Sequence, residues 1–200
     1  IPEQILTEIL QFCASKKIRV VADECFLRFH PHYEKMSCKR FLKQYPNLLI
    51  VNAFTKFYAM AGLRLGYLMI GDLSLLHAVA QQLPEWNVSS IAQRAGISAL
   101  QDTEYEKRTR QLIEKERRYL IQEFLKMGCT VFPSEADYIT FRLPQEKTGF
   151  LLKERLLEGK ILIRSCANYR NMPPDCYRIA VKQHADNEEL VRQVWRILIQ

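Results

Sequence analysis

The chain has 200 residues, of which 29 are Lys or Arg and 22 are Asp or Glu, so its formal net charge is +7. Its 48% hydrophobic and 26% charged residues exclude intrinsic disorder, and its 7 Gly and 8 Pro exclude a collagen-like or linker sequence. The longest apolar runs have the length of strands, well below the roughly 18 residues that a membrane helix needs. The six cysteines form no C-x-x-C pair, and the chain start lacks a signal-peptide pattern. We therefore expect a cytoplasmic protein with reduced thiols and no membrane partner.

Helical and β-rich segments alternate in the first half of the chain, which predicts an α/β fold. Apolar residues at spacings of three and four predict a first helix over residues 2–16. The continuous apolar run 18–22 predicts a strand that is buried on both faces, as in a parallel sheet. Further along we expect a short helix at 36–45, strands at 48–51 and 64–70, and a helix at 73–83.

From residue 88 the pattern changes to long helices followed by a smaller mixed region. Two helices are expected at 89–101 and 103–127, the second with Gly128 as its C-cap. Asp186 is expected to be the N-cap of the last helix. The other elements expected here are strands 129–133 and 137–143, helix 148–158, strands 160–164 and 177–182, and helix 186–199. We place the domain boundary between residues 92 and 93, with a small α+β domain at the C-terminal end.

The densest basic segment of the chain, residues 107–118, also contains glutamates at the spacing of helical ion pairs. The pairs expected at i, i+4 are Glu104/Arg108, Glu106/Arg110 and Glu114/Arg118. A solvated, salt-bridged helix face explains this segment. A nucleic-acid-binding module would show aromatic residues between unpaired basic ones or a known fold signature, and the sequence shows neither. We therefore expect no nucleic-acid partner.

Three chemical features lie at the ends or starts of predicted strands, where open α/β sheets bind ligands. Asp23 follows strand 18–22, and its carboxylate could hold a cationic ring nitrogen, cap a helix or form an ion pair. Lys56 follows strand 48–51, and its amine could act as a nucleophile or be an ordinary surface group. Arg164 and Arg178 could each bind a carboxylate or phosphate, or form a structural ion pair.

Taken together, these residues lie in sequence blocks that resemble the fold type I pyridoxal-phosphate (PLP) aminotransferases of class I and II. The blocks are Asp-Glu-Cys-Phe at 23–26, Thr-Lys at 55–56 followed by Ala-Gly-Leu-Arg-Leu-Gly-Tyr at 61–67, and Tyr-Arg-Ile at 177–179. A lysine followed eight residues later by an arginine inside a G-L-R-x-G-Y turn is a highly specific motif. The resemblance covers nearly the whole chain. It implies the C-terminal part of a PLP-binding large domain over residues 1–92, a mostly parallel sheet with helices, and interdomain helices with a small α+β domain over 93–200.

The resemblance also implies a role for each of these side chains. Lys56 would form the Schiff base with PLP and later move the proton, and Asp23 would pair with the pyridine nitrogen and keep it protonated. Arg64 and Thr55 would hold the cofactor phosphate, and Arg178 would bind the α-carboxylate of the substrate. The cofactor performs the organic chemistry in such enzymes, and the protein sets its electronics and orientation. Enzymes of this kind are homodimers, so the resemblance also implies a homodimer.

Within the family, the stretch Ile-Leu-Ile-Arg-Ser-Cys-x-Asn-Tyr at 161–169 and the block around Lys56 look most like the threonine-phosphate decarboxylases of cobalamin biosynthesis. The histidinol-phosphate aminotransferases are the next most similar group. Both groups act on small phosphorylated amino acids, which makes Arg164 a candidate for binding the substrate phosphate. The resemblance therefore implies decarboxylation of an amino acid phosphate or, alternatively, transfer of an amino group to a 2-oxo acid.

The chain departs from the family pattern at several points. Phe26 replaces the Tyr that often bonds the 3-oxygen of the cofactor, and Ala53 replaces a Ser or Thr that often helps to hold its phosphate. The family also has a substantial N-terminal half, with a phosphate-cradling loop and a ring-stacking aromatic residue, ahead of the region that this chain matches. We therefore expect these 200 residues alone to bind PLP poorly and to be inactive.

Two other classes of function remain open from the residues themselves. The side chains of Cys25, His30, His32 and Cys38 are all potential zinc ligands, although their spacing is not that of a known structural site. The chain could also be a non-catalytic binding protein built on a degraded enzyme fold. Nothing structural requires Lys56 together with the other matched residues, which argues against such decay.

Overall fold

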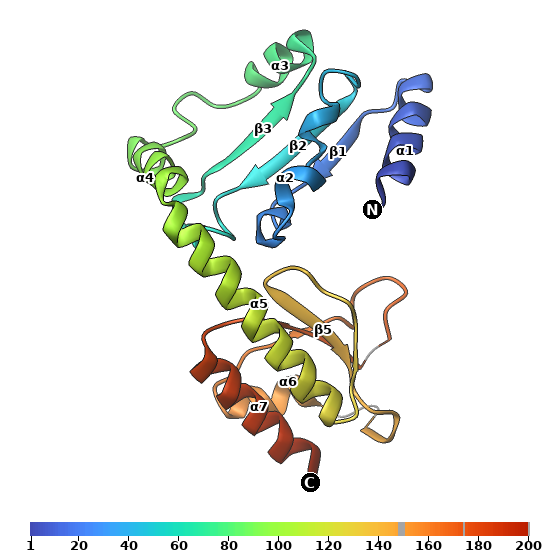
Figure 1. The fold of residues 1–200 in the computed structure, drawn as a ribbon, viewed down its shortest axis with the longest axis vertical. Helices are drawn as coiled ribbons and strands as arrows, with labels where there is room; N and C mark the ends of the chain where they lie inside the picture. Colours follow the sequence, from blue (N-terminus) through green and yellow to red (C-terminus); the bar gives the residue numbers. More distant parts are fainter. Residues whose placement is uncertain (148–150, 174, 200) are drawn as a thin grey trace. The chain divides into compact units, whose positions relative to one another are not determined.

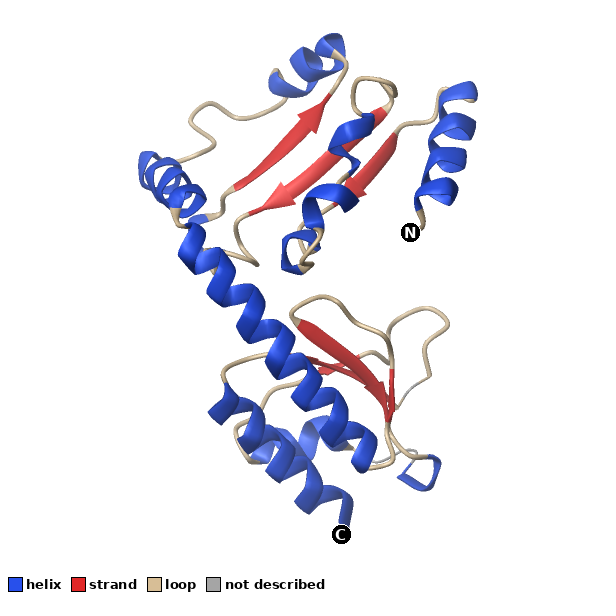
Figure 2. Ribbon diagram, viewed as in Figure 1, coloured by secondary structure: helices blue, strands red, loops and turns tan. Residues whose placement is uncertain are grey.

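The computed structural model describes residues 1–147, 151–173 and 175–199, drawn in Figure 1. The chain divides into two compact units, Ile1–Tyr105 and Glu106–Gln200, and each unit is described by itself. Both combine helices with a β-sheet (Figure 2), as an α/β fold requires. The assignment of domains to residues 1–92 and 93–200 stays a prediction.

The first unit contains three strands and three longer helices. Its main elements are α1 (Glu3–Ser15), β1 (Val20–Asp23), β2 (Leu48–Ala53), β3 (Gly66–Ile70), α3 (Leu73–Ala80) and α4 (Ser90–Gln101). Short helical segments connect them: η1 (Leu27–Phe29), α2 (Tyr33–Met36), η2 (Cys38–Phe41) and η3 (Ala61–Leu63). The expectation of a single helix at 36–45 is therefore wrong. Ser37 is extended, with φ −63° and ψ 136°, and separates α2 from η2.

The sheet of the first unit has the strand order β1-β2-β3. Strands β1 and β2 are parallel, whereas β2 and β3 are antiparallel. The expectation of a mostly parallel sheet is therefore wrong for the described strands. A parallel pair needs a crossover, usually a helix, that carries the chain back to the other end of the sheet. Between β2 and β3 there are only turns and the short η3, so the chain returns in the opposite direction.

Burial differs between the central strand and its neighbour β1. On β2, Leu48, Leu49 and Ile50 are all buried, which confirms the buried strand expected there. On β1, burial alternates from one residue to the next, and Val21 is 60% exposed. The expectation that this strand is buried on both faces is therefore wrong. As an edge strand, β1 packs one face onto the core, which contains Leu10 of α1, and leaves the other face exposed.

Gly71, directly after β3, allows two backbone segments to approach closely. A Cβ atom added there would lie 2.1 Å from the carbonyl oxygen of Leu42. We expect Gly71→Ala to lower the free energy of unfolding by about 1–3 kcal/mol, because backbone would have to shift. Gly62→Ala is the matched control, since nothing lies within 4 Å of a Cβ at that position. Urea unfolding of both variants tests this, and equal losses of stability would contradict it.

The second unit contains a four-stranded antiparallel sheet with the order β4-β5-β7-β6. Helices α5, α6 and α7 lie on one side of this sheet (Figure 2). Its elements are α5 (Thr103–Lys126, which begins in the first unit), β4 (Thr130–Val131), β5 (Tyr138–Arg142), η4 (Gln145–Lys147), α6 (Leu152–Glu158), β6 (Arg164–Ser165), β7 (Cys176–Ala180) and α7 (His184–Ile199). Of the helix expected at 148–158, residues 148–150 lie outside the described residues.

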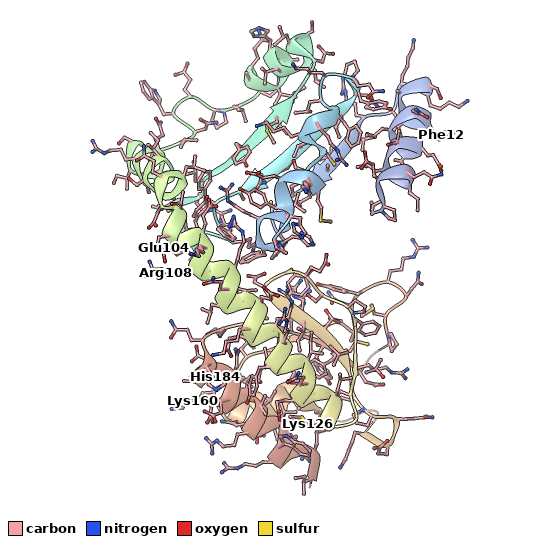
Figure 3. The ribbon with its side chains drawn as sticks, viewed as in Figure 1. Phe12, Glu104, Arg108, Lys126, Lys160 and His184 are labelled. Atoms are coloured by element: carbon pink, nitrogen blue, oxygen red, sulfur yellow. The ribbon has the colours of Figure 1, made fainter. Side chains whose placement is uncertain are left out.

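The ends of two helices test the capping residues expected from the sequence. Helix α5 ends at Lys126, labelled in Figure 3, and Gly128 follows with φ +78°. The Gly128 N–H donates to Leu125 O at 3.0 Å and the Cys129 N–H to Phe124 O at 3.1 Å, a Schellman arrangement that confirms the C-cap role of Gly128.

Asp186 is not the N-cap of the last helix, because α7 begins two residues earlier, at His184. The side chain of Asn187 reaches back to Lys182 instead. Its Oδ1 accepts the Lys182 N–H at 3.0 Å, and its Nδ2 donates to the Lys182 carbonyl at 2.9 Å. These two bonds satisfy backbone groups ahead of the helix, so that Asp186 lies within the first turn.

A buried carboxylate, Glu116, joins α5 to the start of α7. Its side chain is 1% exposed, and its Oε2 accepts a hydrogen bond from Asn187 at 3.1 Å. The same oxygen pairs with Nδ1 of His184 at 3.0 Å (His184 is labelled in Figure 3). Burial acts to raise the pKa of Glu116, but the hydrogen bonds from Asn187 and His184 outweigh it and hold the pKa below its usual value.

Candidate functional site

Asp23 and Lys56 follow neighbouring parallel strands of the first unit. Asp23 is the last residue of β1, and Lys56 lies in the turn that follows β2. The ladder sets Asp23 opposite Val51 of β2. The carboxyl ends of parallel strands meet at one edge of a sheet, where ligands of open α/β sheets bind. The two residue types that the sequence singled out therefore belong to the same edge of the first sheet.

The backbone of Cys25 contacts the Asp23 carboxylate, since its N–H donates to Asp23 Oδ1 at 3.0 Å. Hydrogen bonding by Cys25 lowers the pKa of Asp23, against a smaller opposing effect of burial, so the carboxylate is ionised at neutral pH. Burial and the neighbouring Asp23 carboxylate raise the pKa of the Cys25 thiol to about 11, against a lowering effect of the Lys56 charge. The thiol is therefore protonated at neutral pH.

The ring of Phe26 lies beside the amine of Lys56. The Nζ atom is 5.5 Å from the ring centroid, the geometry of a cation–π contact. Phe26 occupies the position where the sequence departs from the family's Tyr. In this chain the position therefore provides an aromatic face toward Lys56 and no hydroxyl group.

The loop between β2 and β3 carries Thr55, Lys56 and Arg64. The Phe54 N–H donates to Leu65 O at 3.1 Å and closes the loop at its base. Arg64 has left-handed backbone angles, φ 54° and ψ 39°, and its Nη1 donates to Ala61 O at 3.2 Å. Left-handed conformations are costly for non-glycine residues and often occur at functional sites. The loop therefore carries a hydroxyl, an amine and a guanidinium.

Aromatic packing supports this loop beneath Lys56. Phe57 and Tyr58, the next two residues, are buried. The Tyr105 hydroxyl donates to the Phe57 carbonyl at 2.9 Å. The Tyr105 ring stacks on the Tyr58 ring, with 6.0 Å between the ring centroids. The backbone that bears the amine is therefore anchored on its inner side.

Glu24, next to Asp23, is a site residue that the sequence analysis did not single out. It is 7% exposed, and its carboxylate accepts the Ser37 hydroxyl at 2.9 Å and the Cys38 N–H at 2.6 Å. Its own N–H donates to the Val51 carbonyl at 2.9 Å. Glu24 therefore fastens the end of β1 both to β2 and to the segment before η2. The acidic pair at the strand end was the only sign of it in the sequence.

In the second unit, Arg164 and Arg178 lie directly opposite each other on β6 and β7. Thr140 of β5 is opposite Arg178 in turn, so these three side chains form a row on one face of the sheet. Arg178 lies over the Tyr138 ring at 4.9 Å, and Arg164 over the Tyr169 ring at 5.7 Å. Two like charges directly opposite in a ladder repel each other, and an anion bound to both would remove this cost.

The zinc interpretation gains no support from the structure. No group of three or more His, Cys, Asp or Glu side chains that could hold a metal ion occurs within residues 1–147, 151–173 and 175–199. The His32 N–H donates to Nδ1 of His30 at 3.0 Å, and the two rings lie 5.8 Å apart. Cys38 is buried, and Cys25 is half-buried.

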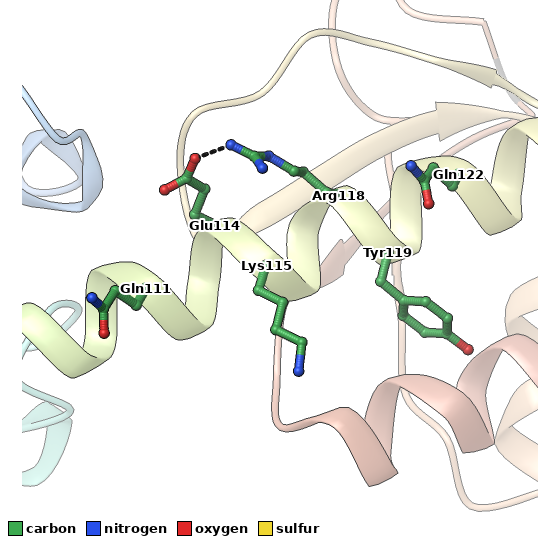
Figure 4. A pocket seen from close by; sticks show the side chains of 6 residues that line it. All are labelled: Gln111, Glu114, Lys115, Arg118, Tyr119 and Gln122. Carbon is green, nitrogen blue, oxygen red and sulfur yellow. Dashed lines mark hydrogen bonds and ion pairs between the residues drawn. The ribbon is translucent and has the colours of Figure 1, made fainter.

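The basic helix face has the expected ion pairs at two of three positions. Glu106 and Arg110 lie 2.7 Å apart, and Glu114 pairs with Arg118 (Figure 4). The pairing of Glu104 with Arg108 stays a prediction.

The pocket in Figure 4 is lined by residues of α5 alone: Gln111, Glu114, Lys115, Arg118, Tyr119 and Gln122. It contains none of the site residues predicted from the sequence. None of the helices in the described part of the chain has the length and apolar character to cross a membrane.

The family model for aminotransferases of class I and II matches residues 1–194. The chain belongs to this family. The match confirms the resemblance found in the sequence blocks around Asp23, Lys56 and Arg178. The family match covers both the loop that carries Lys56 and the strand that carries Arg178, so both units belong to one family pattern.

Curated relatives of this aminotransferase-family chain include two kinds of enzyme. The chain is 35% identical over 200 residues to a threonine-phosphate decarboxylase of Salmonella typhimurium, covering 99% of this chain and 54% of that protein. It is 32% identical over 181 residues to a histidinol-phosphate aminotransferase of Oleidesulfovibrio alaskensis, covering 90% of this chain and 46% of the relative. The chain thus spans about half the length of the curated relatives it matches.

Solved structures show the same fold. The crystal structure of histidinol-phosphate aminotransferase from Clostridium acetobutylicum matches with a TM-score of 0.92 and 30% identity, over 100% of this chain and 60% of that one. The histidinol-phosphate aminotransferase of Sinorhizobium meliloti, solved in complex with pyridoxal-5'-phosphate, matches with a TM-score of 0.84 at 20% identity, over 96% and 52% of the two chains. The second likeness shows the fold alone.

Proposed function

We propose that the whole protein is a PLP-dependent enzyme that decarboxylates a small phosphorylated amino acid, as threonine-phosphate decarboxylases do. The observation that carries this proposal is the placement of Asp23 and Lys56 at the carboxyl ends of neighbouring parallel strands, at one edge of the first sheet. An ionised carboxylate and a primary amine belong to that edge. The match to the class I and II aminotransferase family supports the same chemistry.

The residues of the first unit fit PLP by their chemistry. Lys56 supplies the primary amine that an aldehyde requires. Asp23 supplies a carboxylate that hydrogen bonding by Cys25 keeps ionised, which suits a protonated ring nitrogen. Arg64 and Thr55, on the same loop as Lys56, supply a guanidinium and a hydroxyl for the phosphate. When bound, PLP supplies an electron sink for the bond that breaks at the substrate Cα.

Each side chain then has a defined task. Asp23 holds the proton on the ring nitrogen, and Lys56 moves a proton to or from the substrate Cα. Arg178 binds the α-carboxylate and Arg164 the phosphate of the substrate. Their positions on neighbouring strands, where paired Cα atoms lie about 5 Å apart, suit a small molecule with two anionic groups.

Amino transfer to a 2-oxo acid is the second candidate, because several of the relatives are histidinol-phosphate aminotransferases. Incubation of the whole protein with O-phosphothreonine, and separately with histidinol phosphate plus 2-oxoglutarate, separates the two. We expect carbon dioxide from the first mixture and no glutamate from the second. Glutamate without carbon dioxide would establish the aminotransferase instead. If neither product formed, both proposals would be contradicted.

We also propose that the whole protein is a cytoplasmic homodimer. The six cysteines, all of which lie in the described residues, are free thiols, which supports a reducing compartment. The homodimer is carried over from the family resemblance. Sedimentation equilibrium of the whole protein tests it, and a monomer at micromolar concentration would contradict it.

A further inference from the structure

The guanidinium of Arg28 lies close to the aromatic rings of Tyr33, Phe57 and Tyr58. Arg28 belongs to η1, the short helical segment that follows the turn after β1. Its Cζ atom is 5.1 Å from the ring centroid of Tyr33, 5.8 Å from that of Phe57 and 5.2 Å from that of Tyr58. A guanidinium within about 6 Å of a ring centroid is attracted to the ring. These contacts restrain the guanidinium, and the proposed function gives Arg28 no task.

Two of these rings belong to the loop that bears Lys56. Phe57 and Tyr58 directly follow Lys56, and they are 2% and 8% exposed. The ring of Phe29, the residue after Arg28, lies 5.1 Å from the Phe57 ring between centroids. Segment η1 therefore contacts the residues after Lys56 through two neighbouring side chains, one charged and one aromatic.

The contact between the two segments also runs in the opposite direction. The Nζ atom of Lys56 lies 5.5 Å from the ring centroid of Phe26, two residues before Arg28. Each segment thus presents a cation to aromatic rings of the other: Arg28 to Phe57 and Tyr58, and Lys56 to Phe26. This exchange of contacts holds the turn after β1 and the loop after β2 against each other.

The turn that leads to Arg28 is fixed to the sheet next to Asp23. The Glu24 N–H donates to Val51 O at 2.9 Å, and the Leu27 N–H donates to Glu24 O at 2.9 Å. Arg28 therefore extends from a backbone that is hydrogen-bonded to β2. A side chain that is anchored beside Asp23 and contacts the loop after β2 couples the positions of these two segments.

We propose that Arg28 is a positioning residue that holds the loop bearing Lys56 against the turn bearing Asp23, through its contacts with the two buried rings of that loop. This inference rests on the proposed function, in which a carboxylate and an amine at this edge meet one cofactor. Arg28 acts through the loop and does not itself touch the reacting atoms. Arg28→Met removes the charge and keeps a long unbranched side chain, so it isolates the attraction to the rings.

The first test is amide hydrogen exchange of the whole protein without cofactor, which reports local opening. In the loop, the Ala59 N–H donates to Lys56 O at 3.1 Å and the Met60 N–H to Phe54 O at 3.4 Å. In Arg28→Met these two amides should exchange about three- to tenfold faster, as the loss of a cation–π contact predicts. The amides of β2 should keep their wild-type rates. Unchanged exchange in the loop would overturn the inference, and so would an equal increase in β2, which would show a general loss of stability.

A second variant connects this effect to the rings. Tyr58→Leu removes one of them, so Arg28→Met should accelerate the exchange of Ala59 less in this background than in the wild type. An equal acceleration in both backgrounds would overturn the inference, because Arg28 would then act independently of the Tyr58 ring. The first test does not depend on this variant.

Arg40→Met is the matched control for the lost charge. Arg40 belongs to η2 of the same unit, and its guanidinium lies over the Phe41 ring at 4.8 Å and pairs with Glu3 at 2.9 Å. The substitution therefore also removes a guanidinium from an aromatic ring, but from a ring outside the Lys56 loop. It should leave the exchange rates of the loop unchanged, and faster exchange there would contradict the specific role of Arg28.

The third test measures PLP binding by the whole protein. Arg28→Met should weaken binding about three- to tenfold, whereas Arg40→Met should leave it unchanged. Wild-type PLP affinity in Arg28→Met would overturn the positioning role and leave the proposed function intact. If the wild type binds no PLP, the proposed function itself fails and the positioning role falls with it, while the exchange rates show separately whether the Arg28 contacts form.

Discussion

Replacing Lys56 by alanine is expected to reduce turnover of O-phosphothreonine by the whole protein at least about 10³-fold. The substitution removes both the amine that would hold the cofactor aldehyde and the group that moves the proton, and proton transfer by a positioned side chain alone contributes roughly 10²–10⁴-fold. Borohydride reduction of the PLP-loaded protein, followed by peptide mass analysis, checks the position directly. Pyridoxyl should be attached to Lys56 in the wild type and absent from the variant.

Lys43→Ala provides the matched control, because Lys43 is an exposed lysine of the same unit. It should keep the wild-type rate and the pyridoxyl label on Lys56. A label on any other lysine would contradict the assignment of the amine. A wild-type protein that takes no label and releases no carbon dioxide would favour the degraded, non-catalytic alternative.

Replacing Phe141 by alanine is expected to lower the free energy of unfolding of the second unit by about 3–5 kcal/mol. Phe141 lies on β5 and is 0% exposed. Its ring packs against Phe124 of α5 at 4.3 Å between centroids and against Tyr177 of β7 at 5.9 Å. The cavity left by the ring would therefore separate a helix from two strands. Denaturant unfolding of the whole protein, followed by a probe in this unit, measures the change.

The control for this substitution is Leu162→Ala, in the same unit. Leu162 is 74% exposed, so its truncation should change stability by no more than about 0.5 kcal/mol. If Phe141→Ala and Leu162→Ala had similar effects, the sheet would not pack on α5 as the structure shows. A large effect of Phe141→Ala alone supports that packing.

The helices were largely predictable because their signals are local. The apolar spacing in residues 2–16 predicts α1, and Gly128 marks the end of α5 through its positive φ. Where two neighbouring side chains could bond the backbone at a helix start, the prediction failed. Asp186 is a good capping residue, but Asn187 bonds the backbone of Lys182 and the helix begins earlier. Such competition depends on side-chain geometry that the pattern of residue types does not contain.

Residue types at strand ends predicted the candidate site only in part. The motif blocks singled out Asp23, Lys56 and Arg178. The family match confirms the family, and the roles of these residues stay predictions. Glu24 stands inside the first block but was assigned no task. Its role follows from hydrogen bonds with Ser37 and Cys38, which only the folded turn creates.

By itself, then, the sequence determined the family and most of the helices and strands, and it singled out the candidate site residues, because these signals depend on neighbours a few positions apart. Tertiary structure decided which strands pair, in which direction, and which side chains meet. The exposed face of β1, the antiparallel return of β3 and the facing pair Arg164 and Arg178 all follow from strand pairing. Pairing joins segments that are distant along the chain, and its free energy depends on packing and hydrogen bonds that no local pattern encodes.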